Sequence, residues 1–234
     1  MRPFAAISLV CSLGILTGAP GRAAAASAPA DARAARPLQL VYESRTFDGT
    51  CALVHAESRE HDVALYFITS ARLFKTAEGE PLPPARAIRV TLDDGSEVAV
   101  RHEDVFLPMG NLVDVAVLRA AAPSATFVPG AMTFAAPPSG SDFLIAGYDR
   151  DGAQATIAEH ARFVSTRLVV GDRDASGLAG CVGAPAISAD GIYGVVSECD
   201  VNRAPVITLL SMAYPLIARH VPGLMVRPTL RERP

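Results

Sequence analysis

The sequence predicts an all-β protein made of two small barrels or sandwiches, followed by a C-terminal helix. Short apolar or alternating runs recur between turn signals from Leu38 onward, which is typical of many short strands. A Pro- and Ala-rich stretch, residues 121–140, acts as a linker between two sets of runs. Half of the 234 residues are hydrophobic, and glycine and proline contribute 18 each, so the protein can bury a core and supply many turns.

The first 26 residues have the pattern of a signal peptide. Arg2 provides the positive start, an apolar stretch runs from Phe4 to Leu16, and alanines then offer several A-x-A cleavage choices. The apolar stretch is too short to span a bilayer, although an uncleaved anchor is the alternative interpretation. The sequence therefore predicts a periplasmic or secreted protein. Residues 27–37, rich in Ala, Pro and Arg, are expected to form a flexible leader.

The first set of strands, residues 38–120, makes up the N-terminal half. Asp93-Asp94-Gly95 marks a hairpin turn within it, because Asp and Gly tolerate the left-handed backbone that such a turn needs. The expected strands are Leu38–Glu43, Cys51–His55, Val63–Thr69, Ala87–Leu92, Val98–Arg101 and Val113–Arg119.

The second set, residues 141–210, repeats this pattern in the C-terminal half. Ala189-Asp190-Gly191 is a further hairpin turn between two apolar runs. The expected strands are Phe143–Gly147, Ala153–Ala158, Ala161–Val170, Ala184–Ser188, Ile192–Ser197 and Pro205–Leu210.

Only the end of the sequence has a helical pattern, over residues 211–224. Ser211 can cap the first turn, and Pro215 suits an early helical position. Pro222-Gly223 ends the helix, because neither residue continues it well. The polar and basic residues 225–234 are expected to form a disordered tail.

Three segments, in a fixed order, carry the functional signal. They read ALYFITSAR over residues 64–72, VDVAVL over residues 113–118, and GCVGAPAI over residues 180–187, with a hairpin and the strand YGVVS after the third. This order resembles the trypsin/chymotrypsin superfamily of serine proteases, in its bacterial glutamyl-endopeptidase-like and HtrA-like branches. Those branches show T-A-A-H, then D-[IV]-A-[LV]-L, then G-x-S-G-[GA]-P-[VL] with a V-G-[IV]-V-S strand. The resemblance covers about residues 40–220.

The resemblance implies two six-stranded antiparallel β-barrels with a C-terminal helix, and it implies where catalytic groups would stand. The family histidine corresponds to Arg72, the aspartate to Asp114 and the serine to Val182. Such enzymes need a hydroxyl nucleophile, an imidazole that takes its proton and a carboxylate that orients the imidazole. A guanidinium has no acceptor lone pair, and a hydrocarbon cannot attack a carbonyl. The expected triad is therefore not intact.

A carboxylate without its histidine would be a costly unpaired charge, so Asp114 needs another partner. Arg72 supplies a permanent cation, and we expect a bidentate Asp114–Arg72 ion pair, with Val182 filling the base of the cleft. In the alternative, Arg72 points to solvent and backbone amides satisfy Asp114. The resemblance also implies that the backbone amides of Gly180 and Val182 keep the shape of an oxyanion pocket.

Export would place Cys51, Cys181 and Cys199 in an oxidising compartment, where two of the three can form a disulfide. In the resembling family, the strand before Cys199 walls the specificity pocket. This makes Cys181–Cys199 the preferred pair and Cys51–Cys181 the second. Cys181 is also a rival nucleophile, since a thiolate can attack a carbonyl. It stands one residue early, however, and has no histidine in the base position.

The five histidines have none of the spacings of a zinc motif such as H-E-x-x-H, and no cofactor or metal is expected. A net charge of −3 without a run of Lys and Arg argues against nucleic acid as a partner. No membrane contact is expected after signal cleavage, and the sequence does not fix the oligomeric state.

The expected function is non-catalytic. The protein would be an exported serine protease homologue that binds a peptide or protein through the former active-site cleft, or that regulates a partner. Ser176 and Gly177 would line the old specificity pocket. The alternative is an active serine- or cysteine-type peptidase with its nucleophile relocated to Cys181. A third possibility is a structural or inhibitory accessory protein that does not use the cleft.

Overall fold

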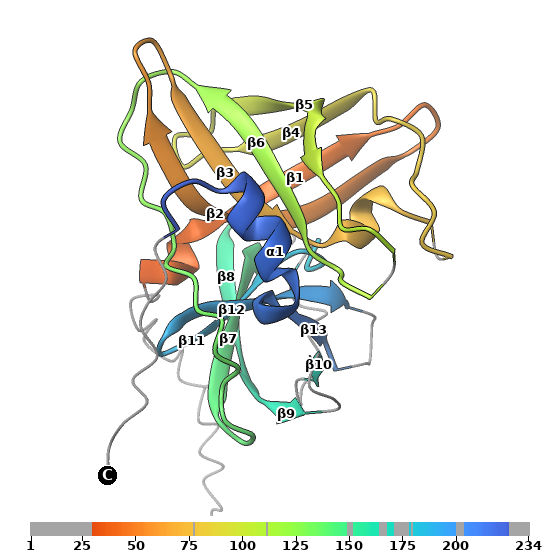
Figure 1. The fold of residues 1–234 in the computed structure, drawn as a ribbon, viewed down its shortest axis with the longest axis vertical. Coiled ribbons are helices and arrows are strands. Elements are labelled where there is room, and N and C mark those ends of the chain that lie inside the picture. The colour runs from red at the N-terminus through yellow and green to blue at the C-terminus, as the bar shows by residue number, and fades with distance from the viewer. Residues whose placement is uncertain are drawn as a thin grey trace, which may run out of the picture.

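The computed structural model describes residues 30–76, 78–110, 112–148, 152–163, 168–170, 178, 180–199 and 204–224. The expected signal peptide, the expected tail, and Ser176 and Gly177 lie outside these residues. Within the described ranges, no helix combines the length and the apolar character needed to cross a membrane. The fold consists of a β-barrel above a second sheet, with a C-terminal helix beside both (Figure 1).

The N-terminal half closes into an antiparallel barrel, here called barrel 1, with the strand order β1-β2-β3-β6-β5-β4. The strands are β1 (Ala35–Val41), β2 (Thr46–Ser58), β3 (Val63–Thr69), β4 (Ala87–Thr91), β5 (Glu97–Phe106) and β6 (Ala116–Ala122). Closure pairs every strand with two neighbours and leaves no open edge.

Strand β3 contributes to two hydrophobic cores at once, because successive side chains of a strand point to opposite faces. Leu65 and Phe67 pack into the core of barrel 1. Tyr66 and Ile68 pack into a core shared with the second sheet and the helix. All seven residues of β3 are buried for this reason. The strand therefore ends, at Thr69, where the two halves of the protein meet.

The expected flexible leader is wrong from Ala30 onward. Ala30–Ala34 forms the 3-10 helix η1, and β1 begins directly after it. Ala32 is fully buried, because a small side chain fits between the two halves. Gln154 Nε2 donates to Ala32 O at 2.6 Å, and Tyr148 Oη donates to Ala35 O at 2.6 Å. The backbone oxygens of this segment thus find partners inside the protein, as buried carbonyls must.

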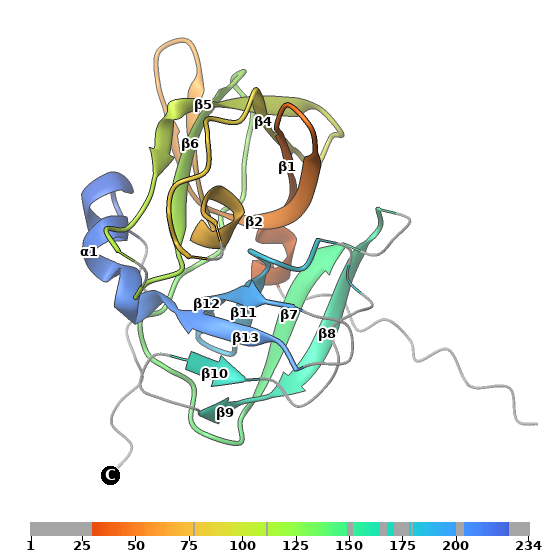
Figure 2. The same ribbon diagram turned by 90° about the vertical axis from the view of Figure 1, so that its right-hand side faces the viewer.

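The C-terminal half forms a seven-stranded antiparallel sheet in the order β8-β7-β11-β12-β13-β10-β9, below barrel 1 (Figure 2). Its strands are β7 (Asp142–Tyr148), β8 (Gln154–His160), β9 (Arg162–Phe163), β10 (Leu168–Val170), β11 (Pro185–Ser188), β12 (Gly191–Glu198) and β13 (Val206–Leu209). The expected single strand Ala161–Val170 is instead two short strands, β9 and β10, which pair with each other. The expected six-stranded second barrel is therefore a seven-stranded sheet.

The C-terminal helix α1 (Leu210–His220) is shorter than expected and starts differently. Strand β13 runs straight into it, so the capping position is Leu209, which has no side-chain cap, and Ser211 is already helical. Pro215 lies inside the helix rather than in its first turn. Burial of Leu210, Ala213 and Ile217 in the shared core holds the helix despite the missing cap.

Candidate functional site

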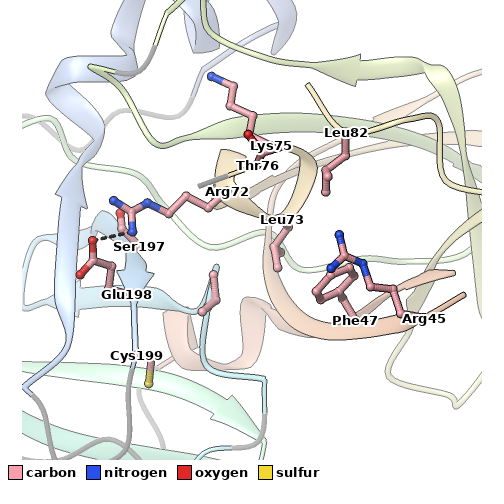
Figure 3. Close-up of a pocket in the computed structure, with 11 residues that line it drawn as sticks. Arg45, Phe47, Arg72, Leu73, Lys75, Thr76, Leu82, Ser197, Glu198 and Cys199 are labelled. Atoms are coloured by element: carbon pink, nitrogen blue, oxygen red, sulfur yellow. Dashed lines mark ion pairs between the residues drawn. The ribbon is translucent and has the colours of Figure 1, made fainter. Parts of the chain in front are cut away.

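A cleft of about 690 Å³ opens between barrel 1 and the second sheet (Figure 3). We call residues Ser70–Thr76 and Asp114 the first wall, and residues Gly180–Ala184 and Ser197–Cys199 the second wall. The first wall includes the 3-10 helix η2 (Ala71–Phe74), which follows β3. Two of the three expected active-site positions, Arg72 and Val182, line the cleft from opposite walls.

The first wall is organised around Asp114. The sequence predicted this residue inside a strand, but it precedes β6, which begins at Ala116. Both carboxylate oxygens accept from buried Ser70 Oγ, at 3.0 and 2.9 Å. Oδ1 also accepts from the backbone N–H of Arg72 at 2.8 Å. Ser70 caps η2, since its Oγ also accepts from Arg72 N at 3.2 Å. Neutral donors of the first wall therefore satisfy most of the hydrogen-bonding capacity of the Asp114 carboxylate.

The guanidinium of Arg72 bridges the two walls. Its Nε lies 3.5 Å from Asp114 Oδ2, and its Nη1 lies 2.5 Å from Glu198 Oε1 on the second wall (Figure 3). The predicted ion pair with Asp114 is present, but its bidentate geometry is wrong. The reason is that Ser70 and the backbone already occupy the carboxylate, so the outer nitrogens of Arg72 reach across to Glu198. With 55% of its side chain exposed, Arg72 remains accessible from the cleft.

The second wall is held by backbone contacts with β2. Val182 O accepts from Thr50 N at 3.0 Å, and Gly180 O accepts from Thr50 Oγ1 at 3.0 Å. At Gly183 φ is +87°, and a Cβ there would lie 2.1 Å from both Thr50 O and Thr69 Oγ1. Only glycine allows this approach. Among the described residues, the N–H groups of Gly180 and Val182 meet no acceptor, and their role as an oxyanion pocket stays a prediction.

Cys181 and Cys199 form a disulfide, with their Cα atoms 6.2 Å apart, which confirms the preferred pairing. The second pairing, Cys51–Cys181, is wrong. Cys51 is a free thiol buried in the core of barrel 1, where burial raises its pKa and keeps it protonated. Because its sulfur is bonded to Cys199, Cys181 has no thiolate to offer as a nucleophile in this state.

No described histidine side chain lines the cleft. His55 packs beside Tyr66, with ring centroids 5.6 Å apart, and burial lowers its pKa. His220 stacks on Phe106, with ring centroids 3.9 Å apart, and burial followed by Arg219 and Arg119 lowers its pKa. Within the described ranges, no three His, Cys, Asp or Glu side chains are close enough together to hold a metal ion.

Sequence reasoning missed Ser70 and Glu198. The signal for Ser70 was a hydroxyl two residues before Arg72, at the end of a buried segment. The signal for Glu198 was a carboxylate directly after the buried run of β12. Neither signal indicates which residue the side chain contacts, because the partners Asp114 and Arg72 come from other parts of the sequence.

Comparison with known proteins places the fold. No protein-family model matches the sequence, and no curated protein matches it. Among solved structures, a scabies mite inactivated protease paralogue is 15% identical, with a TM-score of 0.59 over 81% of this protein and 94% of that one. A serine endoprotease from Yersinia pestis is 16% identical, with a TM-score of 0.58 over 82% and 64% of the two proteins. The HtrA-type protease AlgW with tripeptide is 17% identical, with a TM-score of 0.56 over 82% and 61%.

These similarities confirm the trypsin-like serine protease fold predicted from the three sequence segments. In that fold the protein places Arg72 and Asp114 side by side on one wall of the cleft, with Val182 on the other. The three motif positions therefore meet at one site.

Proposed function

We propose that this protein is an exported, non-catalytic homologue of the trypsin-like serine proteases that binds a peptide or protein segment in its cleft. The observation that carries the proposal is the chemistry of the side chains that line the cleft at two motif positions. Arg72 stands where the family has its base, and Val182 where it has its nucleophile. The carboxylate position, Asp114, keeps the family residue.

Neither lining position can do the family chemistry. A guanidinium stays protonated and has no lone pair to accept a proton, and an isopropyl group cannot form an acyl intermediate. The hydroxyl residue of the second wall is Ser197. This residue is only 4% exposed, and its Oγ lies 2.5 Å from Thr208 Oγ1. Loss of both nucleophile and base removes the covalent route rather than slowing it.

The cleft remains open although these groups are replaced. It has the volume of a small-peptide site and is lined by apolar Phe47, Leu73 and Leu82 as well as by charged groups. The scabies mite neighbour with the same fold is named an inactivated protease paralogue. That name supports the idea that this architecture persists in a protein without protease activity.

Export is supported by the Cys181–Cys199 disulfide, because disulfides persist in oxidising compartments and are rare in the cytosol. The same bond argues against the alternative of a peptidase that uses Cys181. A cysteine nucleophile needs a free thiolate beside a base. Cys181 has neither of these within the described residues.

The first test is catalytic. Purified protein is expected to hydrolyse no member of a fluorogenic peptide panel and to take up no alkyl fluorophosphonate probe, with and without reductant. An active trypsin-like protease, assayed in parallel, shows that the substrates and the probe are competent. Turnover that disappears in Ser197→Ala, or that appears on reduction and disappears in Cys181→Ser, contradicts the proposal.

The second test is binding. A peptide selected from a synthetic array is expected to lose affinity by about ten-fold or more in Val182→Phe, because the larger side chain projects into the cleft. The matched control is Val128→Phe, at a position that is 65% exposed and outside the cleft lining. Equal loss in both variants, or no loss in either, places the peptide elsewhere and contradicts the use of the cleft.

A further inference from the structure

The charged groups that line the cleft are unbalanced. Among the described residues, three cations line it, Arg45, Arg72 and Lys75, against the carboxylate of Glu198 in the lining and that of Asp114, 3.5 Å from Arg72. The whole protein, in contrast, carries a net charge of −3. The positive charge is therefore a local property of the cleft rather than a consequence of composition, and it favours an anionic ligand.

The three cations differ in how far the protein itself uses them. Lys75 Nζ donates to Gly110 O at 2.8 Å and to Pro108 O at 3.3 Å, so it fixes the loop before β6. Arg45 lies over the ring of Phe47, with its guanidinium carbon 4.5 Å from the ring centroid. Among the described residues, no carboxylate pairs with it. Arg45 is thus held in place by an aromatic ring and keeps its charge for a ligand.

The two guanidinium groups stand at opposite ends of the cleft with apolar side chains between them. Figure 3 shows Arg72 directed to Glu198 at one end, and Arg45 beside Phe47 at the other, with Leu73 between. A ligand that contacts both ends needs an apolar or extended middle and an anionic group. A peptide segment meets these conditions if it bears a carboxylate.

We propose that the segment bound in the cleft is acidic, and that its carboxylate binds to Arg45 or to Arg72. At Arg72 the ligand carboxylate displaces Glu198. This inference rests on the proposed function and specifies its ligand. The Arg72–Glu198 contact joins groups whose side chains are 55% and 44% exposed, so water and solutes reach both. Exposed ion pairs of this kind are weak and exchange readily, which lets an incoming carboxylate compete. In the free protein, Glu198 occupies the place of the ligand carboxylate.

This assignment makes opposite predictions for the charged residues of one cleft. Arg72→Gln and Arg45→Gln remove attraction, and each is expected to weaken binding of an acidic peptide by about five-fold. Glu198→Gln removes the internal competitor and one negative charge, and it is expected to strengthen binding by about three-fold. Arg89→Gln is the matched control, because Arg89 pairs with Glu97 on barrel 1 and lies outside the cleft lining.

The probes are fluorescein-labelled peptides selected from a synthetic array and remade with every Glu and Asp changed to Gln and Asn. Each is prepared with a free C-terminal carboxylate and as the amide, so that side-chain and terminal carboxylates are distinguished. Fluorescence anisotropy at low and high salt gives the affinities, and circular dichroism confirms that each variant is folded. We expect the neutral peptides to bind about ten-fold more weakly, and added salt to weaken only the acidic ones.

The outcomes separate this inference from the proposed function. If acidic and neutral peptides bind the cleft equally, or if Glu198→Gln weakens the acidic peptide, the inference fails while cleft binding stands. If no peptide of the array binds, both fail. Selective binding of acidic peptides that is lost in Arg45→Gln or Arg72→Gln, unchanged in Arg89→Gln and improved in Glu198→Gln supports both.

Discussion

The two walls of the cleft hold their shape by different means. On the first wall, side-chain and backbone donors surround one carboxylate, Asp114, and the contacts come from Ser70 and Arg72. On the second wall, carbonyl groups at Gly180 and Val182 bind β2, and glycine permits the close approach. The first wall therefore depends on a partly buried charge, and the second on backbone conformation.

At residues 72 and 182, the two walls use backbone groups, whose contacts do not depend on the identity of the side chain. At residue 72 the protein uses the backbone N–H, which donates to Asp114 whatever the side chain is. At residue 182 it uses the backbone carbonyl, which accepts from Thr50 N. The side chains at both positions line the cleft, where Arg72 pairs with Asp114 and Glu198, and Val182 packs against the core of barrel 1. These backbone contacts therefore do not themselves require the side chains found at the two positions.

The largest effect is expected at Gly183. Gly183→Ala combines a positive φ with a Cβ 2.1 Å from Thr50 O, and should reduce the free energy of unfolding by about 4 kcal/mol. Gly95→Ala is the control, because its φ of +81° is similar but no atom lies within 4 Å of the added Cβ. It should cost only about 1 kcal/mol. Urea denaturation measures both, and equal losses would show that packing at the second wall is unimportant.

Removal of the disulfide is the next largest effect. The double variant Cys181→Ser/Cys199→Ser opens a loop with a sequence separation of 18, and should lower the free energy of unfolding by about 3 kcal/mol. When the protein and the double variant are both measured in reductant, which breaks the disulfide, the difference in their free energies of unfolding should disappear. Alkylation of Cys51 should stay slow in the folded double variant, because that thiol is buried with a raised pKa. Rapid alkylation of Cys51 would show that the core of barrel 1 has opened.

On the first wall, Ser70→Ala removes the hydroxyl that donates to both oxygens of Asp114. A buried hydrogen bond to a carboxylate contributes about 1.5 kcal/mol to the free energy of unfolding, and we expect this loss in urea denaturation. Ser96→Ala is the control, because Ser96 donates to Asp94 in an exposed turn, and we expect no measurable change there. A neutral Ser70→Ala would mean that the backbone N–H of Arg72 alone satisfies Asp114.

The sequence predicted the fold well where a single face or motif decides the structure. Val63–Thr69 was predicted with its observed bounds, because it is a continuous apolar run between two polar segments. The Cys181–Cys199 pair followed from the place of both residues beside one pocket in the resembling family. Residues 30–37 were misjudged, since a run rich in Ala gives no periodic signal, although Ala32 is buried in the core that the two halves share.

The candidate site was predicted in its positions but not in its contacts. Arg72 and Val182 line one cleft, and Asp114 lies 3.5 Å from Arg72. The pairing of Arg72 depends on Ser70, which competes with it for Asp114, and on Glu198, which competes with Asp114 for its guanidinium. Local sequence patterns do not show which of these contacts forms, because that depends on distances that exist only in the folded protein.

A smaller effect, on the pH dependence of stability, is expected where His220 of helix α1 stacks on Phe106 of barrel 1. Burial, Arg219 and Arg119 lower the pKa of His220, so the unfolded protein binds a proton more readily than the folded one. Stability should therefore fall as the pH drops through about 6.5, the ordinary value for histidine, toward the lower folded value. His220→Phe keeps a ring on Phe106 and should flatten this dependence of the unfolding midpoint. An unchanged slope in His220→Phe would assign the pH dependence to other groups.

The smallest effect tests the comparison most directly. If the backbone of residues 72 and 182 carries the structure, Arg72→His/Val182→Ser should change the free energy of unfolding by less than about 1 kcal/mol. Val117→Ser, at a fully buried position of β6, should cost about 3 kcal/mol and shows what the same change does in a core. A double variant as damaged as Val117→Ser would mean that both side chains support the walls. In that case the identity of both side chains would have a structural cause.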